Sequence, residues 1–405
     1  MDFAPPTRQH ALEVMEAFAP RMGRRYASGR NYDHGPGAHK AVSGLAPFVR
    51  RRLITEEELT AIAVAHHGLE GAEKFVQEVV WRSYFKGWLE RRPTIWSAYR
   101  DGLVEDLAAL DTDRRLRKRI DAAENGATGI ACFDAWAEEL VETGYLHNHA
   151  RMWFASIWIF TLGLPWRIGA DFFYRNLLDG DPASNTLGWR WVAGLHTRGK
   201  AYEAKAWNIS KYTGQRFAPR DADLATGIEP LDNTEPDGLP PTTPVRTITP
   251  PDPALPTAFV ITEEDCSPEA FNPMALDIRA CATLAASPLR SDRPVAEHVT
   301  AFEDGALADT AARLGVEATI LRAGSPGDLV RWAERAGAMQ IVTAYVPEGP
   351  LRDWLRRAEP DLAAAGIMLA EWRRDWDSAI WHHATAGFFK VKQQIPKILH
   401  EQECA

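Results

Sequence analysis

The chain has 405 residues, 45% of them hydrophobic and 25% charged, and this composition predicts a globular protein of about two or three domains. It contains no apolar stretch of the roughly 20 residues that a membrane helix needs, and its first residues lack the order of a signal peptide, so we expect a cytoplasmic protein with no membrane partner. The four cysteines lack Cys-x-x-Cys spacing, which predicts no metal site and reduced thiols at Cys132, Cys266, Cys281 and Cys404.

The net charge of −9 hides an asymmetry along the chain. Residues 1–225 carry 30 Lys and Arg against 28 Asp and Glu, whereas residues 226–405 carry 16 against 27. Only the first part is therefore suited to a polyanion such as DNA. Its basic clusters are candidate phosphate contacts, with an ordinary solvated face as the alternative, and they lie at Arg24–Arg25, Arg50–Arg52, Arg91–Arg92 and Arg114–Arg119.

Residues 1–225 predict a helical domain, because their apolar residues recur at helical spacing with almost no alternation. Thr55 is expected to cap the first clear helix, and Asp171 to mark an acidic first turn. The clearest helices are Glu56–His66, Ala72–Glu90, Phe133–Leu146, Asn148–Leu162 and Trp166–Leu178.

Residues 226–256 are rich in proline and predict an extended linker, most clearly from Glu229 to Pro256. Residues 257–405 then alternate short apolar runs with helical segments, which predicts a Rossmann-like α/β domain with a mostly parallel sheet. No G-x-G-x-x-G follows the first of these runs, so this domain shows no dinucleotide fingerprint. The predicted strands are 258–262, 318–323, 339–346 and 366–372, and the predicted helices are Ala306–Leu314, Ser325–Ala336, Pro350–Ala364 and a last segment over 385–402.

Ten of the fifteen tryptophans fall between Trp81 and Trp207, which indicates either an aromatic helical core or a site that stacks flat ligands and moves electrons. Three constellations stand among them. In the first, Glu78 and Trp81 share a helix face with Phe85, which lies one turn further on. In the second, the start of another helix carries Asn148, Arg151 and Met152 on one face. The third lies around a Gly-Asp-Pro turn. The third group consists of Asp179, Asp181, Asn185 and Trp189. Taken alone, the second constellation favours a capped, salt-bridged helix start, whereas the paired carboxylates of the third suggest a buried polar site whose charge Arg151 balances.

The run from TGYLHNHARM to LLDGDPASNTLGWRW, residues 143–191, resembles the most diagnostic stretch of the photolyase/cryptochrome family. That stretch reads TGW(M/L)HN-x-x-RM, then W-R-x-G, then L(I/L)DGDxAxNxGGWQW. Upstream, EVVWRSYF is similar to the family's ELIWREFY, YASGR to its Y-x-x-x-R-D, and VSGLAPF to its phosphate-binding TSRLSPY loop. NISKYTGQRF occupies the place of FNPxxQGxKF, so the resemblance covers about residues 20–220.

The resemblance implies a helical domain that binds FAD. Arg151 and Asp179 correspond to an ion pair beside the flavin, Asp181 to a residue that bonds its ring, and Asn185 to the amide facing N5. The remaining residues that the resemblance assigns to FAD are Tyr26, Val42, Ser43, Leu45, Ala46 and Phe75.

The resemblance further implies a light-dependent lyase that splits cyclobutane pyrimidine dimers in DNA by electron transfer from excited reduced FAD. Glu78 corresponds to the residue that bonds the lesion, and Trp81 to the ring that stacks on it. The other implied DNA contacts are Arg30, Phe85, Asn148, Met152 and Trp191. A cryptochrome-like photoreceptor without repair activity is the alternative, and a non-photochemical flavoprotein is a third possibility.

Two tryptophans match an electron relay to the flavin, Trp189 as the proximal and Trp166 as the middle member. The distal position falls near Thr112 and Asp113, where no aromatic residue stands. The sequence does not decide among the possible replacements, which are Trp96, Tyr99, Trp153, Trp158 and Trp191.

The order of domains differs from the family, since the α/β domain follows the helical one and faintly resembles the family's antenna domain. We expect a monomer with a circularly permuted arrangement. An antenna chromophore stays open, because the first-strand signature W-F-R-x-D-L-R is missing from AFVITEEDCSPE.

Overall fold

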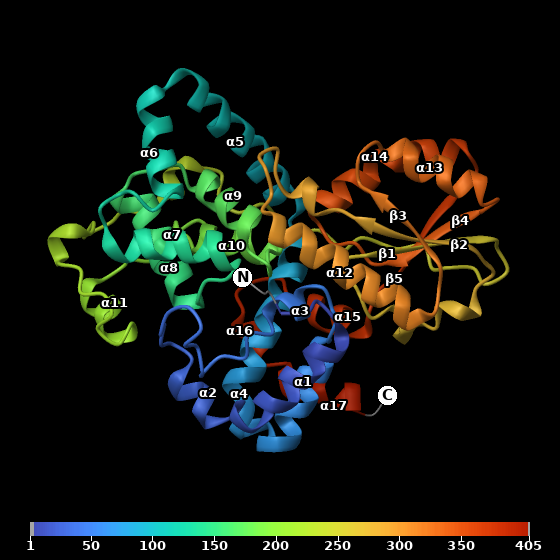
Figure 1. Cartoon of the computed structure of the whole chain (residues 1–405), viewed down its shortest axis with the longest axis horizontal. Coiled ribbons are helices and arrows are strands. Elements are labelled where there is room, and N and C mark those ends of the chain that lie inside the picture. Colours follow the sequence, from blue (N-terminus) through green and yellow to red (C-terminus); the bar gives the residue numbers. More distant parts are fainter. Residues whose placement is uncertain (1–3, 404–405) are drawn as a thin grey trace. The chain divides into compact units, whose positions relative to one another are not determined.

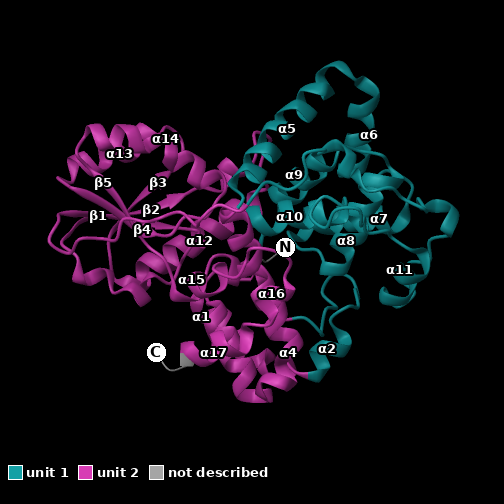
Figure 2. Cartoon of the chain, turned by 180° about the vertical axis from the view of Figure 1, so that it is seen from behind, with its two compact units in different colours: residues 1, 24–42, 92–241 teal, residues 2–23, 43–91, 242–405 magenta. Residues whose placement is uncertain are grey.

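The computed structural model describes residues 4–403, and they form two compact units (Figure 2). Among the described residues, the first unit comprises 24–42 and 92–241, and the second comprises 4–23, 43–91 and 242–403. Each unit is described by itself. The second unit contains residues that precede the proline-rich segment 226–256 as well as residues that follow it. The division into domains 1–225, 226–256 and 257–405 therefore stays a prediction.

The first unit is helical, as the sequence predicts (Figure 1). A single π-helical turn, Ile157–Thr161, continues α8, and two short 3₁₀ turns, Asp221–Asp223 and Leu231–Thr234, follow α11. The α-helices of this unit are α2 (Arg24–Gly29), α5 (Pro93–Thr112), α6 (Arg114–Glu124), α7 (Ala131–Thr143), α8 (Asn148–Ser156), α9 (Trp166–Asn176), α10 (Pro182–Val192) and α11 (Ala206–Tyr212).

Local sequence sets the ends of the helices around α8 to α10. Helix α7 ends at Gly144 in the left-handed conformation, α9 begins directly after Pro165, and α10 has Pro182 in its first position. The expectation for Asp171 was wrong, because this residue lies in the middle of α9, fully buried, and accepts a hydrogen bond from Arg175 Nε at 3.0 Å. Arg175 follows Asp171 by one helical turn, so the carboxylate serves a pair within the helix.

The second unit opens with α1 (Arg8–Phe18), α3 (Ala46–Arg50) and the long α4 (Glu56–Glu90). The predicted cap of α4 is confirmed: Thr55 and Glu58 form a reciprocal capping box. Gly68 interrupts α4 with a φ of 65°, so the two helices predicted on either side of it are both present.

The rest of the second unit contains a five-stranded parallel sheet in the order β3-β2-β1-β4-β5, which confirms the predicted α/β class. One strand, β2, was missed, because its sequence of small residues, IRACATLA, gives little β-branched signal. The strands are β1 (Thr257–Thr262), β2 (Ile278–Ala285), β3 (Ala318–Arg322), β4 (Gln340–Ala344) and β5 (Met368–Trp372).

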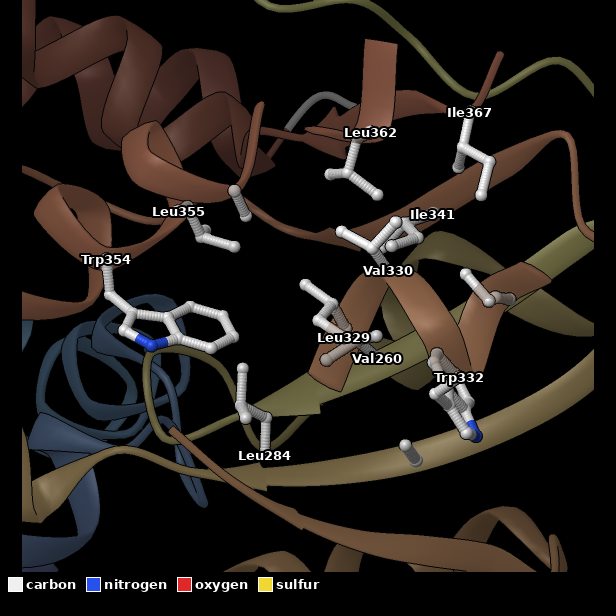
Figure 3. Close-up of a cluster of buried hydrophobic side chains, with 14 of the residues drawn as sticks. Val260, Leu284, Leu329, Val330, Trp332, Ile341, Trp354, Leu355, Leu362 and Ile367 are labelled. Carbon is white, nitrogen blue, oxygen red and sulfur yellow. The ribbon is translucent and has the colours of Figure 1, made fainter. Parts of the chain in front are cut away.

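Helices cover both faces of this sheet (Figure 1). On one face, α13 (Pro326–Arg335) and α14 (Pro350–Ala364) bury an apolar core against the strands (Figure 3). On the other lies α12 (Glu297–Leu314). Alternate residues of β1 serve the two faces, since Ala258 and Val260 belong to the core of Figure 3 while Phe259 contacts Trp372 at 6.0 Å between ring centroids.

The chain ends in three short helices, α15 (Asp375–Trp381), α16 (Phe389–Lys392) and α17 (Ile395–Glu403). Helix α15 packs against α4 so closely that a side chain at Gly87 would meet the ring of Trp381 at 2.5 Å. Trp376 Nε1 donates to Ser83 Oγ at 2.8 Å, which fixes the contact further. The C-terminal segment therefore lies along the helix that carries Glu78 and Trp81.

Candidate functional site

The residues that the sequence predicts for the site fall into both units. The first unit holds Tyr26, Arg30, Val42, Asn148, Arg151, Met152, Trp166, Asp179, Asp181, Asn185, Trp189 and Trp191. The second unit holds Ser43, Leu45, Ala46, Phe75, Glu78, Trp81 and Phe85.

An ion pair joins α8 to the turn after α9. Arg151 Nη1 and Nη2 donate to the two carboxylate oxygens of Asp179 at 3.1 and 3.0 Å, while Arg151 Nε donates to the Leu146 carbonyl at 2.8 Å. The Arg151 side chain is 24% exposed and that of Asp179 is 8% exposed. Such a bidentate pair fixes the plane and position of the guanidinium and keeps one positive charge close to the surface of this unit.

The start of α10 orders two more predicted residues. Asp181 is 1% exposed and caps the helix, since its Oδ1 accepts from the Ser184 backbone N–H at 2.8 Å. One turn on, Asn185 is half-buried, and its Nδ2 donates to the Ala170 carbonyl of α9 at 2.8 Å. Because a carbonyl can only accept, this bond sets which side of the amide carries the oxygen.

Asn148 and Met152 lie on α8, Asn148 exposed and Met152 half-buried. Next to them, His147 and His149 bond the backbone carbonyls of Arg30 and Asn31 at 3.0 and 2.8 Å. Burial lowers the pKa of His147 to about 4, so its ring is neutral near pH 7. These histidines hold the segment after α2.

The two relay tryptophans are both buried, Trp189 at 3% and Trp166 at 5% exposure. Trp189 lies among Phe173 and Trp158, with ring centroids 5.1 and 6.2 Å away. Its ring rests on Gly169, one turn after Trp166 in α9, where an added Cβ would come within 2.4 Å of Trp189 Cη2. The glycine therefore lets the proximal tryptophan reach the helix that carries the middle one.

Beyond Trp166, the neighbouring ring is that of Tyr99, at a centroid distance of 5.8 Å, followed by Trp96 at 5.5 Å from Tyr99. Trp166 and Tyr99 both line a hollow of about 490 Å³ in this unit. Thr112, where the family resemblance places a third carrier, is exposed at the end of α5. Trp191 is half-buried and contacts Tyr202 at 5.4 Å.

In the second unit, the predicted phosphate loop begins with a turn in which Ser43 Oγ accepts from the Leu45 N–H at 3.3 Å. Gly44 between them has a φ of 70°, a conformation that favours glycine. Leu45 is buried, and Ala46 begins α3.

Helix α4 carries the predicted lesion face of the second unit. Phe75 is 5% exposed, whereas Glu78, Trp81 and Phe85 are half-buried. The Trp81 ring lies 5.3 Å from that of Phe85 on its own helix, and 3.9 Å from Phe388 of the C-terminal segment, centroid to centroid.

The family model for the FAD binding domain of DNA photolyase matches residues 75–220, which contain α8, α9, α10 and most of the lesion face. Deoxyribodipyrimidine photo-lyases of Streptomyces griseus and of a Thermus thermophilus strain are 38% and 34% identical over 165 and 192 residues, 40% and 47% of this chain. Residues 75–220 therefore form a domain of the photolyase type. FAD is accordingly the cofactor of its helical domain, as the sequence predicts.

The aligned parts amount to 34% and 43% of these two photo-lyases, so the chain spans less than half the length of the family members it matches. Among solved structures, a bacterial class III photolyase from Agrobacterium tumefaciens is 25% identical, with a TM-score of 0.41, and the match covers 51% of this chain and 43% of that one.

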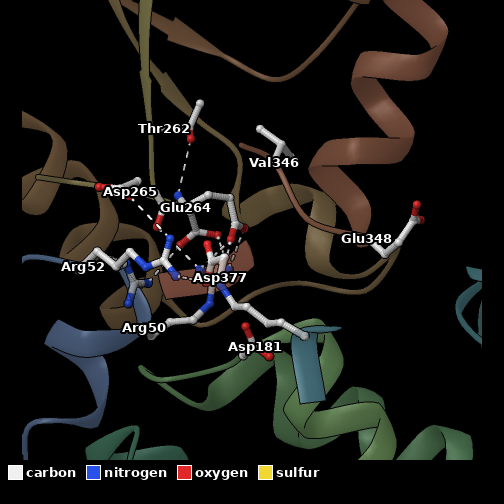
Figure 4. Close-up of polar contacts among 12 residues, drawn as sticks. Arg50, Arg52, Asp181, Thr262, Glu264, Asp265, Val346, Glu348 and Asp377 are labelled. Carbon is white, nitrogen blue, oxygen red and sulfur yellow. Dashed lines mark hydrogen bonds and ion pairs between the residues drawn. The ribbon is translucent and has the colours of Figure 1, made fainter. Parts of the chain in front are cut away.

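The basic cluster Arg50–Arg52 is neither a phosphate contact nor a solvated face, the two alternatives that the sequence offered. Arg50, Arg51 and Arg52 do not face phosphate, because they are 5% exposed or less and pair with acidic residues at the carboxyl end of β1 and with Asp377 (Figure 4). Although burial opposes ionisation, Arg290, Arg50 and Arg51 hold the pKa of Glu263 at about 2. In contrast, the basic residues of 114–119 on α6 are exposed.

The same network lies at the carboxyl end of β1, which pairs with β2 on one side and β4 on the other and is where the order of the strands reverses. Ligands of open α/β sheets commonly bind at this point. Arg50 there donates to both carboxylate oxygens of Glu264, at 3.1 and 2.8 Å, and Arg374 donates to both of Asp265, at 2.8 and 2.6 Å.

Other expectations concern what the chain lacks. No helix within residues 4–403 is long and apolar enough to cross a membrane. Over that range, no group of three or more His, Cys, Asp or Glu is arranged to hold a metal ion. Cys132, Cys266 and Cys281 are buried free thiols, and Cys404 lies outside the described residues.

The sequence did not reveal three groups that contact the predicted site residues. Gly169 stands in the W-R-x-G motif, so its position was visible but its role against Trp189 was not. The Ala170 carbonyl orients Asn185 through the backbone, which no side-chain pattern reveals. Phe388 had no signal at all, since it approaches Trp81 from the far end of the chain.

Proposed function

We propose that this protein binds FAD through its photolyase-type domain and splits cyclobutane pyrimidine dimers in DNA under light, as a deoxyribodipyrimidine photo-lyase does. The observation that carries the proposal is the ordered set on α8 to α10, namely the Arg151–Asp179 pair, the capping Asp181 and the oriented Asn185, within the segment that matches the photolyase model.

The residues present on α10 suit an isoalloxazine ring. Asn185 and Trp189 are four residues apart and share a helix face. The Asn185 Nδ2 is engaged by Ala170, so its Oδ1, an acceptor, points to the other side of the amide. Trp189 Nε1 is a buried donor with no hydrogen-bond partner within residues 4–403. A flavin offers both a ring N–H and ring acceptors, so an acceptor and a donor on one face fit it.

Charge supports the same assignment. Reduced flavin carries extra negative charge, and Arg151, held by Asp179, supplies a cation with a fixed position. Asp181 is expected to bond the ring. The residues expected to hold the rest of FAD are Tyr26, Val42, Ser43, Leu45, Ala46 and Phe75.

On the DNA side, Glu78 is expected to hydrogen-bond the dimer and Trp81 to stack on it after it has flipped out of the duplex. When bound, FAD would absorb the light and would supply the one electron that the dimer takes up and returns. The side chains expected to position the DNA and the dimer's edge are Arg30, Phe85, Asn148, Met152 and Trp191.

Trp189 and Trp166 are expected to pass the electrons that keep the flavin reduced. Their helices meet at Gly169, and Tyr99 is the next ring beyond Trp166. Tyr99 is therefore our candidate for the carrier that replaces the aromatic residue missing at Thr112.

The test is illumination of the reduced, FAD-loaded protein with an oligonucleotide that contains one thymine dimer, scored for restored thymines. Glu78→Ala should lower the repair yield while FAD stays bound. Glu70→Ala, on an exposed residue of the same helix, is the matched control and should repair normally. Equal yields from both variants would remove Glu78 from the lesion face, and no repair by the unaltered protein would refute the proposed reaction.

A cryptochrome-like light sensor is the second candidate, and one observation favours it: Phe388 covers the ring of Trp81 that repair requires. A sensor has no need to stack a flipped base. Flavin photoreduction without any dimer repair, in the unaltered protein and in Phe388→Ala alike, would support the sensor.

A further inference from the structure

Phe388 occupies the Trp81 ring as a stacked base would. Their centroids are 3.9 Å apart and their planes differ by 13°. The other rings that contact Trp81 among the described residues meet it at steeper angles, Tyr84 at 84° and Phe85 at 41°. Phe388 also meets the edge of Tyr84 and is only 9% exposed, so it fills an aromatic corner on α4.

The stacking leaves no space for a base between the two rings. Carbon atoms in contact lie about 3.5–4.0 Å apart, and the observed ring separation already equals one such contact. A base that stacks on this face of Trp81 must therefore displace Phe388.

The segment around Phe388 makes few polar contacts near the ring. Before it, Tyr84 Oη donates to the Ala386 carbonyl at 2.9 Å. After it, Lys392 pairs with Glu73 at 3.2 Å, with side chains 38% and 50% exposed, and an ion pair so exposed contributes little. The main local contacts that an incoming base must release are therefore the stacked Phe388 ring and the fully buried side chains of Ala384 and Val391.

The two ends of the segment are held more firmly. On the N-terminal side, α15 is fixed through Trp376 and Ser83. On the C-terminal side, Ile395 and Ile398 of α17 are buried where α17 meets Val80 of α4. The stretch between them, residues 382–394, is therefore the part that would move away from Trp81 while both neighbouring helices stay in place, and its movement would expose the buried Val391.

We propose that Phe388 stands in for the flipped base on Trp81, and that residues 382–394 form a gate that a flipped dimer displaces. This inference rests on the proposed role of Trp81 in stacking the lesion. Undamaged DNA that binds through its phosphates leaves its bases in the duplex and does not meet Trp81. The gate therefore lowers the affinity for dimer DNA alone, by the fraction of molecules in which Trp81 is uncovered.

The experiment compares dark binding of two oligonucleotides, one with a single thymine dimer and one without, to the FAD-loaded full-length protein. Phe388→Ala should bind the dimer oligonucleotide about fivefold more tightly or better, because a competing stacked ring is removed, and should bind the undamaged one as before. Phe389→Ala is the matched control, since Phe389 is the next residue and 67% exposed, and it should behave as the unaltered protein.

A second variant and a second readout keep the test independent of folding losses. Adding Trp81→Ala to Phe388→Ala should abolish the gain. In the unaltered protein, backbone hydrogen exchange of residues 384–394 should rise when dimer DNA is added and stay constant with undamaged DNA.

The outcomes separate the gate from the proposed function. If the unaltered protein prefers dimer DNA, while Phe388→Ala gains nothing and exchange stays constant, the gate is wrong and the proposed function stands. If neither the unaltered protein nor Phe388→Ala prefers dimer DNA, both are overturned. A gain in Phe388→Ala that persists without Trp81 would also overturn the gate.

Discussion

Gly169→Ala is the change that tests most directly how the relay tryptophans are packed. The added Cβ would lie 2.4 and 2.6 Å from Trp189 Cη2 and Cζ3, and 2.9 Å from Trp158 Cε2. Carbon contacts normally lie about 3.5–4.0 Å apart, so the Trp189 ring must move by roughly 1 Å. Both rings are buried, which leaves them little room to yield.

The cost can be bracketed. Overpacking of this kind destabilises by about 1–3 kcal/mol, whereas replacing a helical glycine by alanine gains up to about 1 kcal/mol from helix propensity. Gly188→Ala is the matched control, because Gly188 adjoins Trp189 in α10 and an added Cβ there meets nothing within 4 Å. The control should gain only the stability that comes from helix propensity, because it adds no clash. The free energies of unfolding of the two variants should therefore differ by about 1–3 kcal/mol.

The assay has two parts, the free energy of unfolding in urea and the rate at which blue light reduces the bound flavin. Gly169→Ala should unfold at lower urea than Gly188→Ala, and its photoreduction should be slower because the Trp189 ring is displaced. Equal stability and equal photoreduction in the two variants would refute the packing argument.

Three further predictions follow from the site and its surroundings. Trp189→Phe should abolish or greatly slow photoreduction while FAD absorbance is retained, and a normal rate would mean that electrons take another route. Asp179→Asn removes the charged partner of Arg151, so stability should fall by about 1–3 kcal/mol and flavin should be lost more readily on gel filtration; full retention at unchanged stability would contradict the role of the pair. Burial and the nearby Glu348 raise the pKa of Glu90 to about 7. Between the ordinary pKa and about pH 7 the folded protein then holds a proton that the unfolded chain has lost, so stability should fall as pH rises through this window, by up to about 3 kcal/mol. In Glu90→Gln this part of the pH dependence of the urea midpoint should vanish, and an identical slope would argue that Glu90 is ionised in the folded protein.

Several helix ends in both units follow from contacts within a few residues. The capping box of Thr55 with Glu58 and the left-handed Gly144 after α7 both act within one turn of their helices, and a sequence displays such patterns directly. Strand β2 was missed because small residues encode a buried strand no more clearly than a helix.

The candidate site also has features that the sequence predicted and features that only the structure revealed. The motif around Asp179 and Asn185 indicated a photolyase-type FAD domain from the sequence, and the structure added the bonds that orient these side chains. Only the tertiary structure decided that Arg50–Arg52 pair with carboxylates rather than phosphate, since all their acidic partners except Glu56 lie more than 200 residues away. These distant partners are Glu263, Glu264, Asp265 and Asp377. A charged run specifies its own sign, but which opposite charge buries it depends on the loops that the fold brings together. The stacking of Phe388 on Trp81 was hidden from the sequence for a similar reason, because no sequence pattern marks which aromatic rings will stack. Only the packing of the C-terminal segment along α4 could reveal it.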